Sequence, residues 1–119
     1  MTLVFVYGTL KRGGSNHHYL AGQEFVAPAR TAPGYRLYRL GDYPGLVASP
    51  GAPAAITGEV WSVDDACLAG LDRLEGTAEG LYERVPVALE GSFPDGGVQG
   101  YLYLRDVSGL ADCGPTWEV

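Results

Sequence analysis

Hydrophobic residues along this chain gather in short runs separated by glycine and proline, a pattern typical of β-strands joined by turns. Residues 3–6 are continuously apolar, which indicates a strand buried on both faces. A later run alternates, so that Val85, Val87 and Leu89 share one side of a strand. The pattern predicts strands over residues 3–6, 25–31, 35–40, 55–63, 82–89 and 98–104.

Two helices are predicted between these strands. The longer one is expected to begin at Asp64-Asp65, whose carboxylates suit an N-cap and the positive end of a helix, and to run to Glu75. The shorter one is expected over residues 17–21, capped by Ser15 or Asn16. Strands in the majority with two helices beside them indicate an α+β fold.

Glycine and proline also predict where the strands are interrupted. Pro28 cannot donate a ladder hydrogen bond, so residues 25–31 are expected at a sheet edge or across a bulge. Residues 41–45 are expected to form a turn, and residues 90–97 are expected to form the loop of a hairpin.

The length of 119 residues suits one domain, expected to cover residues 1–119, because a chain of this size can bury a single core. Its 18 glycines and 8 prolines favour a turn-rich protein with many short elements over a helical bundle. We find no internal repeat and no interdomain linker in the sequence.

Charge and cysteine content exclude several classes of partner. The net charge is −6 and the largest basic cluster is Lys11-Arg12, so nucleic acid is not an expected partner. The two cysteines are far apart in sequence and have no metal-ligand spacing, which predicts neither a disulfide framework nor a metal site. No stretch has the length of a signal-peptide core or a membrane helix, so no membrane partner and a cytoplasmic location are expected.

The segment Tyr7-Gly8-Thr9-Leu10 follows the first apolar run and is the first candidate for chemistry. Gly8 has no Cβ to block close approach of the backbone, so neighbouring N–H groups are able to turn toward one bound anion. A glycine after a strand also suits a simple tight turn, and the segment alone leaves both interpretations open.

Glu75 is the second candidate. Three- and four-residue spacing places it on the helical stripe of Leu68, Leu71 and Leu74, in the final turn, beside carbonyls without helical partners. Burial and the negative helix end both disfavour the carboxylate, so its pKa is expected to rise from about 4.3 toward about 6 to 7, a range suited to proton transfer. The alternative is a surface glutamate that pairs with a nearby arginine.

Several short motifs occur in order along the chain and resemble those of one known family. They are Tyr7-Gly8-Thr9-Leu10, Tyr43-Pro44-Gly45-Leu46, Gly58-Glu59-Val60-Trp61, Leu71-Asp72-Arg73-Leu74-Glu75-Gly76 and Tyr82-Glu83-Arg84. Together they resemble the gamma-glutamylcyclotransferase-like family, in particular its AIG2-like, gamma-glutamylamine cyclotransferase branch. The resemblance spans nearly the whole chain and implies a small mixed β-barrel with a few flanking short helices.

The resemblance implies a cofactor-independent enzyme that releases 5-oxoproline and a free amine from a small molecule carrying a gamma-glutamyl group. In this reaction the α-amine attacks the side-chain carbonyl of its own glutamyl group. Glu75 matches the family's acid/base catalyst, and Tyr7, Gly8, Thr9 and Leu10 match the loop that holds the glutamyl end. Aromatic walls would complete the pocket, for which the candidates are Tyr43, Tyr82 and Tyr103.

The roles of the remaining polar residues stay open or are expected to be structural. Arg84 is a candidate for a substrate carboxylate, with orientation of Glu75 and bridging of a strand edge as alternatives. Glu79 ranks second as a catalyst should the helix register differ. His17-His18 is expected at the surface or in packing, and Asp72 is expected in solvent. Glu83 is a further alternative to Glu75 should the helix register differ. The C-terminal segment 114–117 matches the family only loosely.

Three functions are compatible with these residues. The first is the cyclotransferase. The second is a catalytically silent protein that binds a small molecule in the same pocket. The third is a related acyl-removal step in a biosynthetic pathway that uses the same ring closure.

Overall fold

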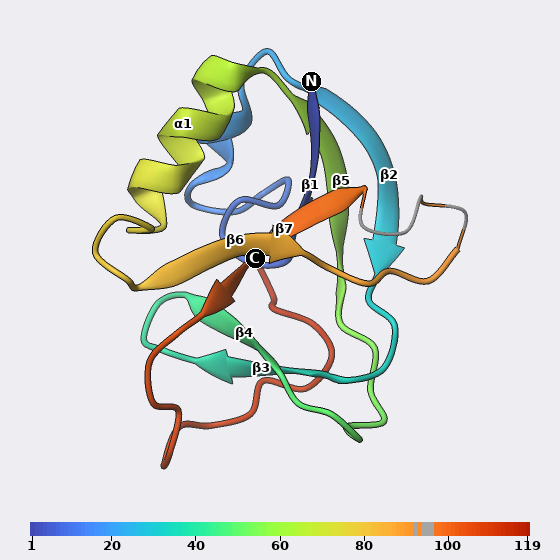
Figure 1. Cartoon of the computed structure of the whole chain (residues 1–119), viewed down its shortest axis with the longest axis vertical. Coiled ribbons are helices and arrows are strands. Elements are labelled where there is room, and N and C mark those ends of the chain that lie inside the picture. The colour runs from blue at the N-terminus through green and yellow to red at the C-terminus, as the bar shows by residue number, and fades with distance from the viewer. Residues whose placement is uncertain (92, 94–96) are drawn as a thin grey trace.

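The computed structural model describes residues 1–91, 93 and 97–119. Strands dominate the architecture, and the single long helix of the described residues packs over one end of the sheet, beside the segment that follows the first strand (Figure 1). The elements are β1 (Thr2–Val6), the 3₁₀ helix η1 (His17–Leu20), β2 (Glu24–Arg30), β3 (Tyr35–Arg39), β4 (Pro44–Ala48), β5 (Thr57–Val63), α1 (Asp65–Leu74), β6 (Tyr82–Pro86) and β7 (Val98–Tyr103).

The seven strands form one mixed sheet in the order β2-β5-β1-β7-β4-β3, with β6 paired to β7. Strand β7 is the junction of the sheet, because it runs parallel to both β1 and β4 and antiparallel to β6. The pairings among the described residues follow an open path from β2 to β3, so they establish an α+β fold but not the closed barrel that the resemblance implies. An isolated bridge between Thr31 and Leu89 adds one further link.

Most of the predicted strands are present with shifted ends, and one strand was not predicted. Residues 41–45 were expected to form only a turn, whereas β4 begins at Pro44 and pairs with both β3 and β7. Proline is tolerated as the first residue of a strand, so these long-range pairings override the local turn signal. The expectation for Pro28 is confirmed: β2 is an edge strand whose register shifts between Phe25 and Ala27.

Helix α1 has the predicted start and end. The carboxylate of Asp64 accepts the backbone N–H of Cys67 at 2.7 Å, which satisfies one donor of the first turn. Glu75 caps the C-terminus, and Gly76 follows with a φ of 65°, a left-handed conformation that glycine adopts without strain. On the inner face, Leu71 is fully buried.

The shorter helix differs from its prediction. It is a 3₁₀ helix of four residues, and no side chain caps it. Asn16, a predicted cap, instead donates from its amide to the Thr9 hydroxyl at 3.0 Å. This side chain therefore holds the loop after β1 in place of the helix end.

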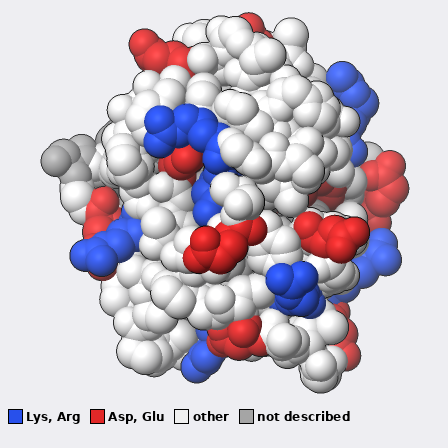
Figure 2. Space-filling view, turned by 180° about the vertical axis from the view of Figure 1, so that it is seen from behind, with Lys and Arg blue, Asp and Glu red and all other residues white. Residues whose placement is uncertain are grey.

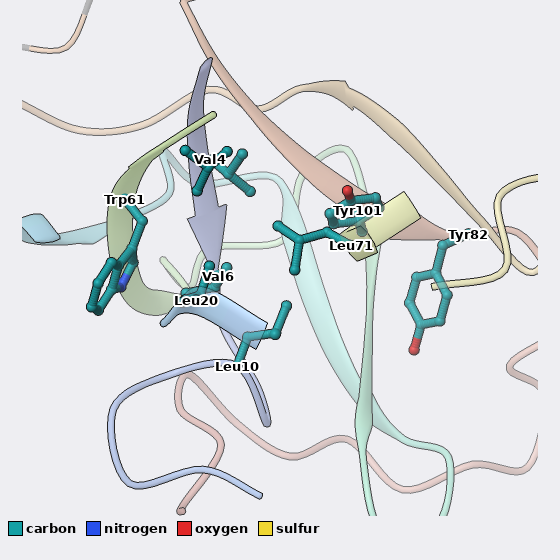
Figure 3. Close-up of a cluster of buried hydrophobic side chains, with 9 residues drawn as sticks. Val4, Val6, Leu10, Leu20, Trp61, Leu71, Tyr82 and Tyr101 are labelled. Carbon is teal, nitrogen blue, oxygen red and sulfur yellow. The ribbon is translucent and has the colours of Figure 1, made fainter. Parts of the chain in front are cut away.

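Buried side chains form two clusters on the sheet. The cluster in Figure 3 joins β1, η1, β5 and α1 and includes Val4, Val6, Leu10, Leu20, Trp61, Leu71, Tyr82 and Tyr101. The second cluster centres on Phe5, Leu37, Leu46 and Val60. Since β1 contributes alternate residues to both clusters, it is buried on both faces, as its continuous apolar run predicts.

Charged side chains of both signs lie interspersed on the face of the molecule shown in Figure 2. Within the described ranges, no helix is both long and apolar enough to cross a membrane. The centre of the predicted 90–97 hairpin loop, residues 92 and 94–96, lies outside the described residues, while β6 and β7 that flank it pair antiparallel.

Candidate active site

A cavity of about 320 Å³ opens where the end of β1, the C-terminus of α1 and strand β6 meet. Its wall contains the loop residues 7–10 and the helix-capping Glu75, which lie 65 or more positions apart in sequence. Aromatic residues cover much of the remaining wall. The residues that line it include Tyr7, Gly8, Thr9, Leu10, Asn16, Tyr43, Pro44, Leu74, Glu75, Leu81, Tyr82 and Tyr101.

The loop after β1 depends on a close contact between Gly8 and Pro44. A Cβ atom built on Gly8 would lie 2.6 Å from Cγ of the Pro44 ring and 2.8 Å from its Cδ, distances too short for any side chain. Glycine is therefore required here because the Pro44 ring packs against its Cα, a contact that the sequence did not predict. The turn itself is closed by Lys11, whose N–H donates to the Gly8 carbonyl at 3.1 Å.

The N–H groups of Gly8, Thr9 and Leu10 have no hydrogen-bond acceptor among the described residues. Buried or half-buried N–H groups in proteins are nearly always paired, so three free donors beside a cavity are available to a ligand. Asn16 holds this segment from one side, since its own N–H donates to the Thr9 carbonyl at 3.0 Å.

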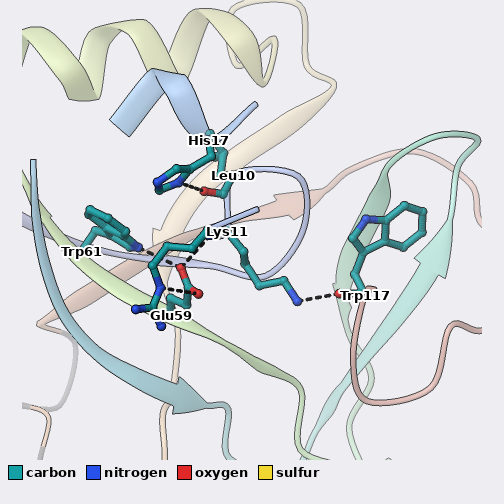
Figure 4. Close-up of polar contacts among 7 residues, drawn as sticks. Leu10, Lys11, His17, Glu59, Trp61 and Trp117 are labelled. Atoms are coloured by element: carbon teal, nitrogen blue, oxygen red, sulfur yellow. Dashed lines mark hydrogen bonds and ion pairs between the residues drawn. The ribbon is translucent and has the colours of Figure 1, made fainter. Parts of the chain in front are cut away.

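Glu59 anchors the chain just beyond this loop, at Arg12 (Figure 4). Its carboxylate accepts the Trp61 indole N–H at 3.1 Å, the Arg12 backbone N–H at 3.1 Å and the Arg12 guanidinium Nε at 3.2 Å. Burial raises the pKa of Glu59, but these hydrogen bonds outweigh burial and hold the pKa below its ordinary value. Glu59 thus stays ionised and fixes the loop from behind.

Two further contacts complete the support of the loop (Figure 4). The buried ammonium of Lys11 donates to the backbone carbonyl of Trp117, which ties the loop to the C-terminal segment. The Nδ1 atom of His17 lies 3.0 Å from the Leu10 carbonyl, and its ring packs edge-on against Trp61. His17 therefore has the packing role that its sequence context predicts.

Glu75 is half-buried in the cavity wall. Its backbone N–H donates to the Leu71 carbonyl at 2.9 Å, which continues the helical ladder into the cap and aims the side chain from a fixed position. Burial raises the pKa of Glu75 to about 7. Within the described residues Glu75 forms no ion pair, so the alternative of a glutamate paired with a nearby arginine does not hold.

Two tyrosine hydroxyls of the same cavity wall are fixed by hydrogen bonds. Tyr7 donates to the Tyr101 carbonyl at 2.7 Å and accepts the Leu46 N–H at 3.3 Å. Tyr82 donates to the Pro44 carbonyl at 2.8 Å. Burial raises the pKa of Tyr7 and of Tyr82 well above the ordinary tyrosine value, so both remain neutral.

The structure brings together most of the predicted site residues, namely Tyr7, Gly8, Thr9, Leu10, Tyr43, Glu75 and Tyr82. Tyr103 does not line the cavity and packs edge-on against Tyr82 behind the wall. Glu79 and Glu83 are exposed and lie outside the cavity.

Arg84 and Asp72 pair with each other outside the cavity, which differs from the sequence-based expectation for both residues. Arg84 was a candidate for binding substrate, but it lies outside the cavity and its Nε donates to the Asp72 carboxylate at 2.9 Å. Asp72, expected in solvent, is half-buried and also accepts the Tyr101 hydroxyl at 2.7 Å. Arg84 lies two residues beyond Tyr82 on the same face of β6, and there its guanidinium contacts Asp72 of α1 and not the cavity.

Sequence reasoning missed Tyr101, Asn16, Leu74 and Leu81 as lining residues. Tyr101 and Tyr103 lie two residues apart on the same face of β7, and their different places along the strand, opposite Arg84 and Tyr82 of β6, put Tyr101 but not Tyr103 in the cavity wall. The described residues contain no group of three or more His, Cys, Asp or Glu side chains placed to hold a metal ion.

Residues 4–115 match the family described as gamma-glutamyl cyclotransferase, AIG2-like. A relative from Vibrio cholerae is 51% identical over 73 residues, which cover 61% of this chain and 61% of that protein. The human gamma-glutamylaminecyclotransferase is 39% identical over 97 residues, which cover 76% of this chain and 63% of the human protein.

Solved structures of proteins with similar sequences have the same fold. The solution structure of protein ytfP from Escherichia coli superposes with a TM-score of 0.71 at 33% identity, covering 99% of this chain and 96% of that one. The chain thus has the fold of these proteins, and it belongs to the AIG2-like gamma-glutamylcyclotransferase family. Membership of this family implies a small-molecule substrate that carries a gamma-glutamyl group.

Proposed function

We propose that this protein is a cyclotransferase that converts a gamma-glutamyl amine or gamma-glutamyl amino acid into 5-oxoproline and a free amine. One observation carries the proposal: a carboxyl group with a pKa of about 7 and a loop with three N–H donors line the same cavity, and none of these groups has a partner among the residues that the structure describes. The two parts supply the proton transfer and the anion stabilisation that ring closure needs.

Substrate binding begins at the loop of residues 7–10. The free N–H groups of Gly8, Thr9 and Leu10 are donors for negative charge on the glutamyl end, either its carboxylate or the oxyanion that develops at its carbonyl. The net charge of −6 opposes an anionic ligand, so local donors of this kind are necessary.

The reaction is an intramolecular displacement. The α-amine of the glutamyl group attacks its own γ-carbonyl, so a nitrogen–carbon bond forms and closes a five-membered ring, and the bond from that carbon to the leaving nitrogen breaks. Glu75 first takes a proton from the attacking ammonium and then gives a proton to the leaving nitrogen. The ring nitrogen loses its second proton as the intermediate collapses, and the released amine takes up that proton and departs as an ammonium ion. Protons balance within the cycle, and no covalent enzyme intermediate is formed.

Glu75 suits both proton steps. With a pKa of about 7, comparable populations of carboxylate and carboxylic acid exist near neutral pH, so the group accepts and returns a proton at little cost. The protein does not have to supply a nucleophile, because both reacting groups belong to one molecule and the cavity only has to fold the glutamyl chain into its attack geometry.

The aromatic wall suits the leaving group. Tyr82 is buried and its hydroxyl is tied to the Pro44 carbonyl, while Tyr43 is 42% exposed and lies where the wall meets solvent. We assign Tyr43 and Tyr82 to the side of the cavity that contacts the departing amine, and the loop of residues 7–10 to the glutamyl side.

The decisive experiment is an assay for 5-oxoproline over a panel of gamma-glutamyl amines and gamma-glutamyl amino acids. We expect product from at least one donor, and we expect Glu75→Gln to lower kcat by about 100-fold or more while the variant stays folded. If the whole panel is inert but its members raise the melting temperature, the protein is a binding protein of this fold and the proposal is wrong.

A further inference from the structure

Asp72 lies about one helical turn before Glu75 on α1. Both its side chain and its backbone form hydrogen bonds with residues outside the helix. Its carboxylate accepts the Tyr101 hydroxyl at 2.7 Å and two guanidinium nitrogens of Arg84, Nε at 2.9 Å and Nη2 at 3.2 Å. Its carbonyl accepts the N–H of Thr77 at 3.1 Å, just beyond the helix end. Side chain and backbone of one residue thus fix both sides of the last turn.

The contacts of Asp72 continue into the cavity wall. Tyr101, whose hydroxyl binds Asp72, lines the cavity, and its carbonyl accepts the hydroxyl of Tyr7. Tyr7 in turn accepts the N–H of Leu46 on β4. A continuous series of hydrogen bonds therefore joins α1, β7, the end of β1 and β4, which are the elements around the cavity.

Arg84 completes this group from strand β6. It stands opposite Tyr101 in the ladder between β6 and β7, and its Nη1 donates to the amide of Gln99 on the same neighbouring strand. The side chains of Arg84 and Asp72 are both about a quarter exposed, 28% each, so solvent screens their ion pair less than it screens a fully exposed pair.

We propose that Asp72 is a positioning residue for Glu75: held by Arg84 and Tyr101, it fixes the last turn of α1 against β6 and β7 so that the Glu75 carboxyl stays in the cavity wall. This inference rests on the proposed function for its kinetic consequences. The physical need is clear, because the last turn of a helix lacks part of its hydrogen bonding and opens more readily than the middle.

The sign of the effect on Glu75 follows from the groups around it. Tyr7, Tyr82 and Tyr101 face it from the sheet as neutral hydroxyls, and the charges nearest along the chain are Asp72, Arg73 and Glu79. Replacing Asp72 by alanine removes one negative charge, leaves Arg84 unpaired and lets the helix end open to water. All three changes favour the Glu75 carboxylate and lower its pKa.

The test compares Asp72→Ala, Asp72→Asn and Tyr101→Phe with the wild-type chain, by NMR titration of the Glu75 carboxyl and by the kinetics of 5-oxoproline release. We expect the pKa of Glu75 to fall by about one pH unit in Asp72→Ala. We expect kcat to fall about tenfold with a smaller change in KM, and Asp72→Asn to retain an intermediate rate because its amide oxygen still accepts from Tyr101.

Tyr101→Phe separates the effect of moving the Glu75 carboxyl from the effect of removing the Asp72 charge. It removes only the hydroxyl that binds Asp72 and keeps the ring in the wall, so a lower kcat and a lower Glu75 pKa in this variant report a displaced carboxyl. Glu90→Gln is the matched control, because it breaks an ion pair of 2.6 Å with Arg30 far from the cavity wall. We expect wild-type kinetics and an unchanged Glu75 titration from it.

The outcomes distinguish this proposal from the proposed function. If Asp72→Ala and Tyr101→Phe match Glu90→Gln in both measurements, Asp72 does not position Glu75, whatever the activity of the wild type. If the wild-type chain releases no 5-oxoproline from any donor, the proposed function fails, and the NMR titration still decides whether Asp72 holds Glu75 in place. Should Asp72→Ala not fold, Asp72→Asn and Tyr101→Phe carry the same comparison.

Discussion

The surroundings of the Glu75 carboxyl group decide what the cavity is able to do. A glutamate in water has a pKa near 4.3 and is almost fully ionised at neutral pH, so it is a weak base. Burial beside Leu74 and the tyrosines raises the pKa of Glu75 to about 7. The same aliphatic helix face that stabilises the fold therefore makes this carboxyl a stronger base.

This pKa predicts a pH dependence of the reaction. Because Glu75 must be a carboxylate to accept the ammonium proton, kcat/KM is expected to rise tenfold per pH unit below about pH 7 and to level off above it. The measurement is kcat/KM for 5-oxoproline release between about pH 5 and pH 9, which covers about two pH units on each side of that pKa. Glu75→Gln should lose the inflection along with the activity.

A flat profile across that range would contradict the prediction, since it would mean that no group with a pKa near neutrality limits the reaction. Glu59 is the internal comparison: its pKa lies below the ordinary value, so its ionisation does not contribute an inflection near pH 7. The pH profile thus distinguishes the two buried or half-buried glutamates of the site.

Among the elements, the loop of residues 7–10 shows how a short segment is kept ready for a ligand. It has no regular structure of its own and is held by side chains outside it: Asn16 binds Thr9 directly, and Glu59 anchors Arg12, two residues after Leu10. Glu59 is 9% exposed and satisfies three donors, so removing it leaves the Trp61 and Arg12 N–H groups without their acceptor. Each lost partner costs about 1–3 kcal/mol.

Glu59→Ala is accordingly expected to raise KM by about tenfold and to lower the melting temperature, with a smaller effect on kcat, because in the proposed function the loop holds the glutamyl end and does not transfer protons. Steady-state kinetics and thermal unfolding measure the two effects. Glu59→Gln is the matched control: it keeps an oxygen acceptor for Trp61 and should recover most of the loss. Equal KM values for Glu59→Ala and the wild type would show that the loop does not depend on this anchor.

Elements whose signals are local could be predicted from the sequence, and those that depend on distant partners could not. Helix α1 has its cap, apolar stripe and glycine stop within about a dozen residues, and its prediction is confirmed. Strand β4 was missed because Pro44 and Gly45 are turn residues by composition. They form a strand because β3 and β7 pair with it, and a Cβ on Gly45 would lie 2.9 Å from the Cβ of Tyr103.

In the candidate site, too, residues with local sequence signals could be predicted and those that depend on strand pairing could not. Glu75 and the segment of residues 7–10 were predicted from helical spacing and from a glycine after a strand, and the structure places both at one cavity. The positions of Arg84 and Tyr101 depend on the register between β6 and β7, which a single sequence does not specify. The ion pair between Arg84 and Asp72 therefore could not be predicted from the sequence.

For the whole molecule, a carboxyl held at a raised pKa has a cost in stability. In the unfolded chain this group releases its proton near its ordinary value of 4.5, whereas in the folded protein it does so near 7. Between these pH values the folded state binds more protons than the unfolded state, so stability falls as the pH rises. Above about pH 7 the loss is complete and constant.

Glu75→Gln should reveal this cost directly, because glutamine does not titrate. Each pH unit of difference corresponds to 1.36 kcal/mol, and solvent at the cavity mouth reduces the effect, so we expect the variant to gain about 1 to 3 kcal/mol relative to the wild type between pH 4.5 and 7.5. Denaturant unfolding of both proteins at several pH values measures the difference. If the unfolding free energies of the two proteins change in parallel with pH, Glu75 has the same pKa in the folded and unfolded states and the prediction is wrong. If the two curves diverge as predicted, the fold retains a destabilising carboxyl group at the position where the proposed reaction needs one.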